Sequence, residues 1–179
     1  MHAVMALATV RRAVDADVDA LVRIQSDTWR AAYAGLVPAE ALAHVSTPEA
    51  RAAWRAAVGA GGGHHVFVAS EGEWTVGFCA AAYYGGENGA AIAEVSTLLV
   101  EPRWGRRGHG GRLLAAAADA LRGHGASAGW AWVPEADAAS RAFYAHAGWE
   151  ADGAVRGLDT GAGTLREIRL SGPLDLRLR

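Results

Sequence analysis

Short segments of apolar residues run along the chain, and their spacing alternates between the period of a strand and that of a helix. Residues 7–12 predict a first strand. Apolar residues at helical spacing then predict a helix, which Asp15 and Asp17 can cap and which breaks after Tyr33. Two more helices are predicted over residues 40–45 and 47–58, before a flexible glycine loop.

The rest of the chain predicts mainly strands. They cover residues 65–70, 74–84, 91–100, 127–133, 150–156 and 164–171, with a hairpin turn at 85–89. Helices are predicted over residues 108–124 and 138–147, and Gly148 ends the second one. We write the order as β-α-α-β-β-β-α-β-α-β-β, an α/β fold with a mixed, mostly antiparallel sheet and helices on both faces. With no repeat or linker, residues 1–179 are expected to form a single domain.

Composition narrows the class of protein. The chain is 51% hydrophobic and carries a net charge of −2, which argues against a nucleic-acid-binding surface. Its 17 basic residues are all Arg, so a lysine Schiff base is excluded. Cys79 is the single cysteine, which excludes an intrachain disulfide and a cysteine zinc cluster. No signal peptide or membrane-spanning run is evident, so we expect a cytoplasmic protein that does not bind a membrane.

The most informative segment is a glycine-rich basic turn at residues 105–111, between an apolar strand and a helix. Backbone N–H groups at such a helix start can surround an anion. Glycines suit this position because a Cβ would hinder both the turn and the approach of a ligand. The turn therefore predicts a phosphate site. It has no Gly-Lys-Ser/Thr of a P-loop, and it lacks the third glycine of a dinucleotide fingerprint.

The element order and this turn together resemble the GNAT superfamily of acetyl-CoA-dependent N-acetyltransferases, over roughly residues 7–174. The family's pyrophosphate motif, Gln/Arg-x-x-Gly-x-Gly/Ala, maps onto residues 105–110. Gly108 and Gly110 match the motif, whereas Gly105 stands where the family has Gln or Arg. We expect Arg106 or Arg107 to replace that contact, or the backbone amides to suffice.

A second motif strengthens the resemblance. Residues 137–149 are similar to the family's Asn-x-x-Ala-x-x-Phe-Tyr-x-x-x-Gly-Phe. Phe143, Tyr144 and Gly148 match it, and Asp137 and Ser140 depart from it conservatively.

The resemblance implies that acetyl-CoA is a cosubstrate, bound in a V-shaped gap between the strands at 91–100 and 127–133. It implies main-chain contacts to the pantetheine arm and the pyrophosphate. These come from Leu98, Leu99 and Val100, and from Arg106, Arg107, Gly108, His109, Gly110 and Gly111. Asp137 could approach the cofactor as the family's Asn does, although helix capping alone would explain an Asp there.

The resemblance also implies catalytic roles. Tyr144 is the candidate general acid for the leaving thiolate, and the alternative is an aromatic that only packs. Glu94 is the candidate base, because its spacing to Gly108 matches the base of histone-type members; the alternative is a carboxylate that orients substrate or faces solvent. Trp29 and Tyr33 are candidates for the acceptor wall, with core packing as the alternative.

We therefore expect an N-acetyltransferase that moves an acetyl group to a primary amine of a small molecule or peptide. Direct attack is expected, because Cys79 is far in sequence from every motif. A non-catalytic acyl-CoA-binding or sensing domain and a pure interaction module are the competing hypotheses. His64 and His65 lack nearby metal-ligand partners, so no metal site is expected. Protein N-termini, aminoglycosides, polyamines and small amines all stay open as acceptors, and a homodimer is compatible with the sequence.

Overall fold

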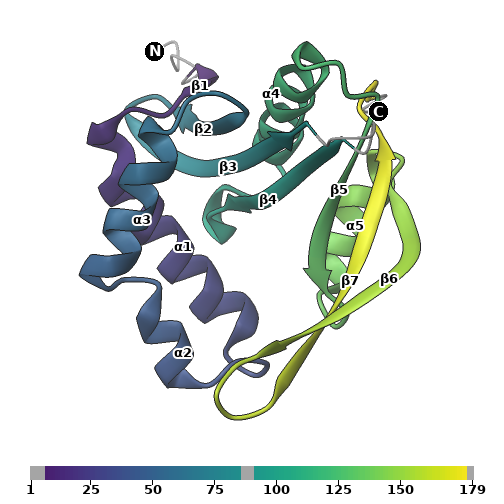
Figure 1. Ribbon diagram of the computed structural model, residues 1–179. Helices are drawn as coiled ribbons and strands as arrows, with labels where there is room; N and C mark the ends of the chain where they lie inside the picture. Colours follow the sequence, from purple (N-terminus) through teal and green to yellow (C-terminus); the bar gives the residue numbers. More distant parts are fainter. Residues whose placement is uncertain (1–6, 86–90, 177–179) are drawn as a thin grey trace.

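The computed structural model describes residues 7–85 and 91–176 (Figure 1). Its strands are β1 (Ala8–Arg12), β2 (His64–Glu71), β3 (Trp74–Tyr84), β4 (Ile92–Val100), β5 (Ala128–Pro134), β6 (Glu150–Asp159) and β7 (Thr164–Pro173). They form one seven-stranded sheet in the order β1-β2-β3-β4-β5-β7-β6. Strands β4 and β5 are parallel, and the other neighbouring pairs are antiparallel.

The helices are α1 (Val18–Tyr33), α2 (Ala39–His44), α3 (Pro48–Gly59), α4 (His109–Gly123) and α5 (Ala138–His146), with short 3-10 turns η1 (Asp15–Asp17) and η3 (Pro102–Trp104). The expected fold class is confirmed. Three helices stand between β1 and β2, one more than in the expected order, and each lies where a helical segment was predicted. Apart from Gly85, the expected hairpin turn at 85–89 lies outside the described residues.

Local sequence signals explain where the helices begin. The Thr47 hydroxyl accepts a hydrogen bond from the Ala50 N–H at 3.2 Å, and Pro48 follows as the first helical residue of α3. The Asp137 carboxylate caps α5 by accepting from the Ser140 N–H at 3.0 Å. Asp17 acts differently from the expected cap of α1: its carboxylate binds Arg11 and accepts from the Val14 N–H at 2.8 Å. This contact fixes the chain just before the helix.

Apolar cores form on both faces of the sheet, because side chains alternate along each strand. On one face, Leu21 and Ile24 of α1 pack against residues of β2 and β3, including Phe78. On the other, Leu113, Leu114 and neighbouring residues of α4 pack on the same strands. In Figure 1, α5 lies behind β5 and β7, on the side of α4. Each fully buried leucine contributes about 1.5–3 kcal/mol to stability.

Strands β4 and β5 separate after a short contact. Glu94 and Trp130 are the one bridging pair recorded between them in the described ranges. Just beyond, Ala80 pairs with Thr97 and Ala81 with Val95, so Ser96 is the extra residue of a β-bulge. A bulge bends its strand and increases its twist, which turns the end of β4 away from β5.

Strands β5, β6 and β7 carry large polar and aromatic side chains on the face that points away from α4 and α5. Ala131 and Ile168 point into the core beside α4 and α5, so alternation directs Trp132 and Arg169 to the other face. There the guanidinium of Arg156 lies 4.5 Å from the Trp132 ring centre, and that of Arg169 lies 4.7 Å from the centre of Trp130. Tryptophan and arginine side chains thus alternate across β5, β7 and β6, and we call these four residues the Trp–Arg ladder.

Among the residues that the structure describes, no helix has the length and apolar character needed to cross a membrane.

The close approach of β3 to β4 generates a prediction about Gly77. A Cβ at this position would lie 2.7 Å from the Leu99 carbonyl oxygen, so Gly77→Ala must displace the backbone of β4. We expect a loss of about 1–3 kcal/mol in the free energy of unfolding, measured by urea denaturation.

Gly59→Ala is the matched control, since Gly59 ends α3 with open space around its Cβ position. It should be neutral or slightly stabilising, because glycine is a poor helix former. Equal stability of the two variants would contradict the close contact between β3 and β4.

Candidate active site

A pocket of about 450 Å³ lies where β4 ends and α4 begins. Four parts of the chain form its walls: α1, the end of β4, the glycine turn with the start of α4, and α5. The lining residues are Thr28, Ala32, Tyr33, Leu98, Leu99, Val100, Trp104, Gly105, Arg106, Gly108, His109, Gly110, Gly111, Asp137, Ala139, Ser140, Phe143 and Tyr144. The fold thus brings together the strand end, the glycine turn and the Phe-Tyr motif, which the sequence places far apart.

The glycine turn has the backbone geometry of an anion-binding loop. Gly108 precedes the first residue of α4 and has a φ of +83°, while Arg106 has a φ of +61°. A left-handed residue in such a turn allows successive N–H groups to face one concave surface. Gly110 is also needed for packing, because a Cβ there would come within 3.0 Å of the Phe143 ring. The two predicted motifs therefore touch at this point.

The two arginines of the turn have different surroundings. Arg106 lines the pocket. Arg107 instead donates to Glu71 on β2 at 2.7 Å and lies over the Trp104 ring, and it is not among the lining residues. The buried ring of His109 also binds Glu71, with 2.8 Å between Nε2 and Oε2. These hydrogen bonds, with that to His109 the largest cause, hold the pKa of Glu71 below its usual value. Glu71 of β2 thus holds the glycine turn in place through Arg107 and His109.

Several polar atoms around this pocket are buried without a protein partner. In the described part of the chain, four buried side-chain atoms have no hydrogen bond, and three belong to residues that line the pocket: Thr28 Oγ1, Trp104 Nε1 and His109 Nδ1. An unsatisfied buried polar group costs about 1–3 kcal/mol. Their concentration at one place indicates a site built for a polar ligand.

Leu98, Leu99 and Val100 present a strand edge to the same pocket. They pair with β3 on one side, and β5 has already separated from them on the other. Their backbone groups on that side can therefore bind an extended ligand as an added strand would be bound.

Tyr144 stands between this pocket and a second cavity of about 140 Å³, because it lines both. The residue is 5% exposed, and its ring stacks on Trp149 with 5.3 Å between ring centres. Burial, aided by Cys79 and Tyr33 nearby, raises the pKa of the Tyr144 hydroxyl well above its ordinary value. Tyr144 therefore keeps its proton at neutral pH and can act as a donor.

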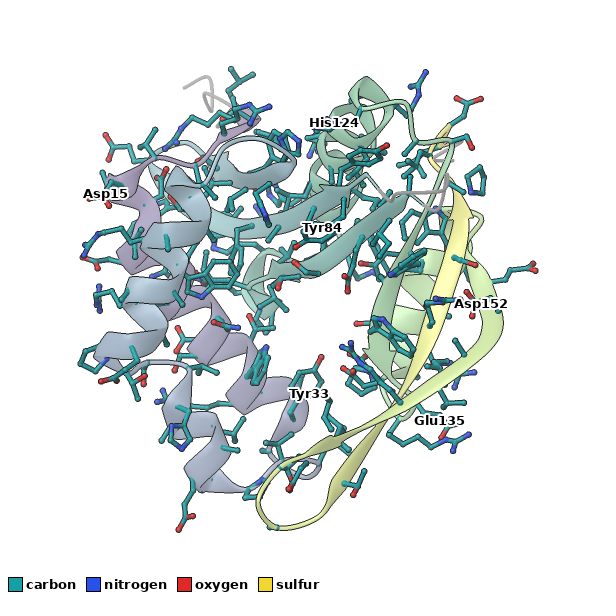
Figure 2. All side chains as sticks on the ribbon, in the orientation of Figure 1. Asp15, Tyr33, Tyr84, His124, Glu135 and Asp152 are labelled. Carbon is teal, nitrogen blue, oxygen red and sulfur yellow. The ribbon has the colours of Figure 1, made fainter. Side chains whose placement is uncertain are left out.

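The second cavity contains both aromatic residues expected on the acceptor wall. Trp29 and Tyr33 line it, with their rings in an edge-to-face contact at 5.6 Å. Figure 2 shows Tyr33 between α1 and the strands of the C-terminal half. Its hydroxyl donates to Asp137 Oδ2 at 3.2 Å, and burial, together with Asp137, raises its pKa. Asp137 thus joins α1 to the cap of α5 and lines the larger pocket as well.

Glu94 lies beside the second cavity without lining it. Burial raises the pKa of its carboxyl group, Arg156 opposes this rise, and the carboxylate of Glu167 adds to it. Glu167 of β7 does line the cavity. The structure thus brings two carboxylates to the region of the second cavity, of which the sequence indicated one.

Cys79 is fully buried in the core, and burial raises the pKa of its thiol to about 12. A thiol with this pKa is almost entirely protonated at neutral pH and is a poor nucleophile. Among the described residues, no group of three or more His, Cys, Asp or Glu side chains is arranged to hold a metal ion.

Comparison with known proteins identifies the family. The sequence profile of the acetyltransferase (GNAT) family matches residues 19–149, most of the chain. The chain belongs to the GNAT acetyltransferase family. This membership confirms the resemblance and makes the protein an acyltransferase. No curated protein sequence matches the chain.

Solved structures share the GNAT fold at low sequence identity. PaiA N-acetyltransferase from Thermoplasma acidophilum, in complex with coenzyme A, has a TM-score of 0.76 at 16% identity, over 93% of this chain and 99% of that one. The ribosomal-protein-S18-alanine N-acetyltransferase from Escherichia coli has a TM-score of 0.66 at 19% identity, over 95% and 96%. YncA from Salmonella typhimurium, with its cofactor acetyl-CoA, has a TM-score of 0.64 at 22% identity, over 94% and 95%.

Some residues of the GNAT site gave little signal in the sequence. Thr28 sits among the apolar positions of a helix, and Trp104 stands just before the glycine turn without a motif of its own. Glu167 is one of several charged residues in its strand, between Arg166 and Ile168.

The burial of Cys79 predicts its reactivity. In the folded protein at pH 8, we expect no measurable reaction of this thiol with a disulfide reagent such as DTNB, followed by absorbance. Adding denaturant should release one thiol per chain, since Cys79 is the single cysteine. Rapid reaction of the folded protein would show that the thiol is accessible and ionised, contrary to its position in the core.

Proposed function

We propose that this GNAT protein transfers an acetyl group from acetyl-CoA to a primary amine, which attacks the thioester directly. The observation that carries this proposal is the position of Tyr144. It is a buried proton donor at the junction of a pocket suited to coenzyme A and a cavity suited to an amine.

The residues of the larger pocket fit coenzyme A. Its pyrophosphate suits the backbone amides of residues 108–111 at the start of α4, with Arg106 beside them. Its amide-containing arm suits the free edge of Leu98–Val100. The hydroxyl of Thr28 and the indole N–H of Trp104 are buried atoms that need a hydrogen-bond partner. Two structures with the same fold hold coenzyme A or acetyl-CoA.

When bound, acetyl-CoA supplies an acetyl group activated as a thioester. The amine nitrogen forms the new bond to the carbonyl carbon, and the carbon–sulfur bond breaks. Tyr144 donates its proton to the departing sulfur, since the hydroxyl carries that proton at neutral pH.

The acceptor amine has to lose a proton, because an alkylammonium has a pKa near ~10. Glu94 is the proposed destination of that proton. Its raised pKa brings it closer to the working pH than an exposed carboxylate would be. Since Glu94 lies outside the lining of the cavity, the proton passes to it through water.

An acyl-enzyme on Cys79 is the less favoured route. The thiol is buried in the core, and its pKa of about 12 leaves very little thiolate at neutral pH. The non-catalytic sensing domain is likewise less favoured, because such a domain has no need for Tyr144 at the junction.

A cytoplasmic location, the lack of nucleic-acid partners and a homodimer stay predictions from the sequence. They do not enter the chemistry proposed above.

The family's Gln or Arg at the position of Gly105 is missing here, and its contact to the pyrophosphate needs a replacement. The different surroundings of Arg106 and Arg107 predict that Arg106 makes this contact. Arg106→Ala should weaken binding of acetyl-CoA about tenfold, measured by calorimetry, because it removes a charged donor from the pyrophosphate site. Arg107→Ala is the matched control and should change the affinity less than about threefold, since Glu71 already engages that side chain. The reverse order of effects would assign the contact to Arg107.

The experiment that tests the function is release of free thiol from acetyl-CoA in the presence of amines, for the wild type and Tyr144→Phe. Loss of the general acid should lower kcat by about 10²–10⁴-fold while affinity for acetyl-CoA stays similar. Binding of acetyl-CoA without turnover on any amine would favour the sensing domain. Full turnover by Tyr144→Phe would remove this residue as the acid.

A further inference from the structure

We infer that Glu167 binds the incoming amine and restricts the acceptor to compact monoamines with an apolar or aromatic carbon skeleton. This inference rests on the proposed function and adds the class of acceptor.

Glu167 is held in place by the Trp–Arg ladder. It lies on β7 opposite Arg156 of β6, and its side chain is buried. Arg156 Nε donates to Glu167 Oε2 at 2.6 Å, while the Arg156 guanidinium stacks on Trp132, itself a lining residue of the cavity. No described residue donates a hydrogen bond to Oε1 of Glu167. That oxygen is available to accept a hydrogen bond from an amine N–H.

Glu167 is the one charged side chain among the described residues that line the cavity. The remaining walls are aromatic or aliphatic, apart from a few hydroxyl groups. They include Trp29, Trp132, Leu158 and Leu165. The free oxygen of this carboxylate can accept from one amine group, and the apolar walls can contact one apolar body.

The size of the cavity limits the body of the acceptor. Its volume is about 140 Å³, and an apolar protein cavity of roughly 150 Å³ holds a benzene molecule. The space among these lining residues therefore suits a ring or a short alkyl chain, and Glu167 and Tyr144 are among the polar side chains that its amine can reach.

The same charges disfavour other amines. A polyamine or an aminoglycoside would bring several ammonium groups into a cavity with one carboxylate, and burying an unpaired charge is costly. An amino acid would bring a carboxylate. No arginine is among the described residues that line the cavity, and the two arginines of the Trp–Arg ladder are already paired, Arg156 with Glu167 and Arg169 with Asp152 at 2.7 Å.

The first test uses the wild-type protein. Phenethylamine and phenylalanine share a skeleton and differ by a carboxylate, and spermidine adds further ammonium groups. We expect kcat/KM for phenethylamine to exceed that for phenylalanine and for spermidine by at least about tenfold, measured as thiol release from acetyl-CoA.

The second test removes the charge of Glu167. Glu167→Gln should raise KM for phenethylamine about 10- to 100-fold, because a hydrogen bond to a charged group is lost. The dissociation constant of acetyl-CoA should stay unchanged. Glu167→Asp, which keeps the charge on a shorter side chain, should recover part of the affinity, and thermal unfolding checks that each variant is folded.

Glu135→Gln is the matched control. Glu135 is an exposed carboxylate whose ion pair with Arg166 is 2.7 Å long. Figure 2 shows it at the C-terminal strands, away from Tyr33. This variant should leave KM for the amine and turnover unchanged.

The outcomes separate the two proposals. Preferential turnover of spermidine, an amino acid or a peptide α-amine would overturn the acceptor class and leave the acetyltransferase function standing. An unchanged KM in a folded Glu167→Gln would overturn the role of Glu167. Binding of acetyl-CoA without turnover of any amine would overturn the proposed function, and the inference with it.

Discussion

The separation of β4 from β5 is the constraint on which the rest of the site depends. Two adjacent parallel strands would normally continue their hydrogen bonds along their shared length. Here they bridge at Glu94 and Trp130, and the bulge at Ser96 then bends β4 away. The end of β4 is fixed in this direction from outside, because its following residue, Glu101, is buried and receives ion pairs from Arg23 and Arg103. A strand edge is thereby left open in the interior of the sheet.

An open edge and several unpaired polar atoms make the larger pocket an unfavourable region for the protein alone. Such groups persist when the surrounding structure over-determines their positions, and they collect at binding sites. Glu71 supports the glycine turn from outside, and Asp137 joins Tyr33 to the start of α5. The free energy lost at the pocket is offset by two ordinary apolar cores on either side of the sheet.

Local patterns in the sequence were enough to predict the helices and strands. The contacts between them depend on long-range packing and strand register, and these could not be predicted. Each predicted helix and strand lies within a few residues of its expected bounds, because caps, turns and periodicity are local properties. The glycine turn and the Phe-Tyr pair could be identified for the same reason. The contact between the glycine turn and the Phe-Tyr pair, made by Gly110 and Phe143, could not be predicted, since it depends on how α5 packs against α4.

The surroundings of charged residues are the feature of the site that was hardest to predict from the sequence. Arg106 and Arg107 are adjacent and identical in type, yet Arg106 lines the larger pocket while Arg107 binds Glu71. Glu167 acquires its place from the pairing of β7 with β6, which sets Arg156 opposite it. Glu94 was predicted from its spacing to Gly108, and that spacing could not show that Glu94 stays outside the lining of the cavity.

The Trp–Arg ladder lies beside the cavity proposed to hold the acceptor, and this has a consequence for self-modification. Its cations are guanidinium groups, which lie over indole rings and keep their charge at any physiological pH. A guanidinium is a very weak nucleophile toward a thioester, whereas a lysine at Arg156 or Arg169 would hold a competing amine beside the reaction. The chain contains no lysine at all, so no side-chain amine of its own can be acetylated. The positive charge that holds Glu167 is thus supplied by the guanidinium of Arg156, a group that acetyl transfer does not consume.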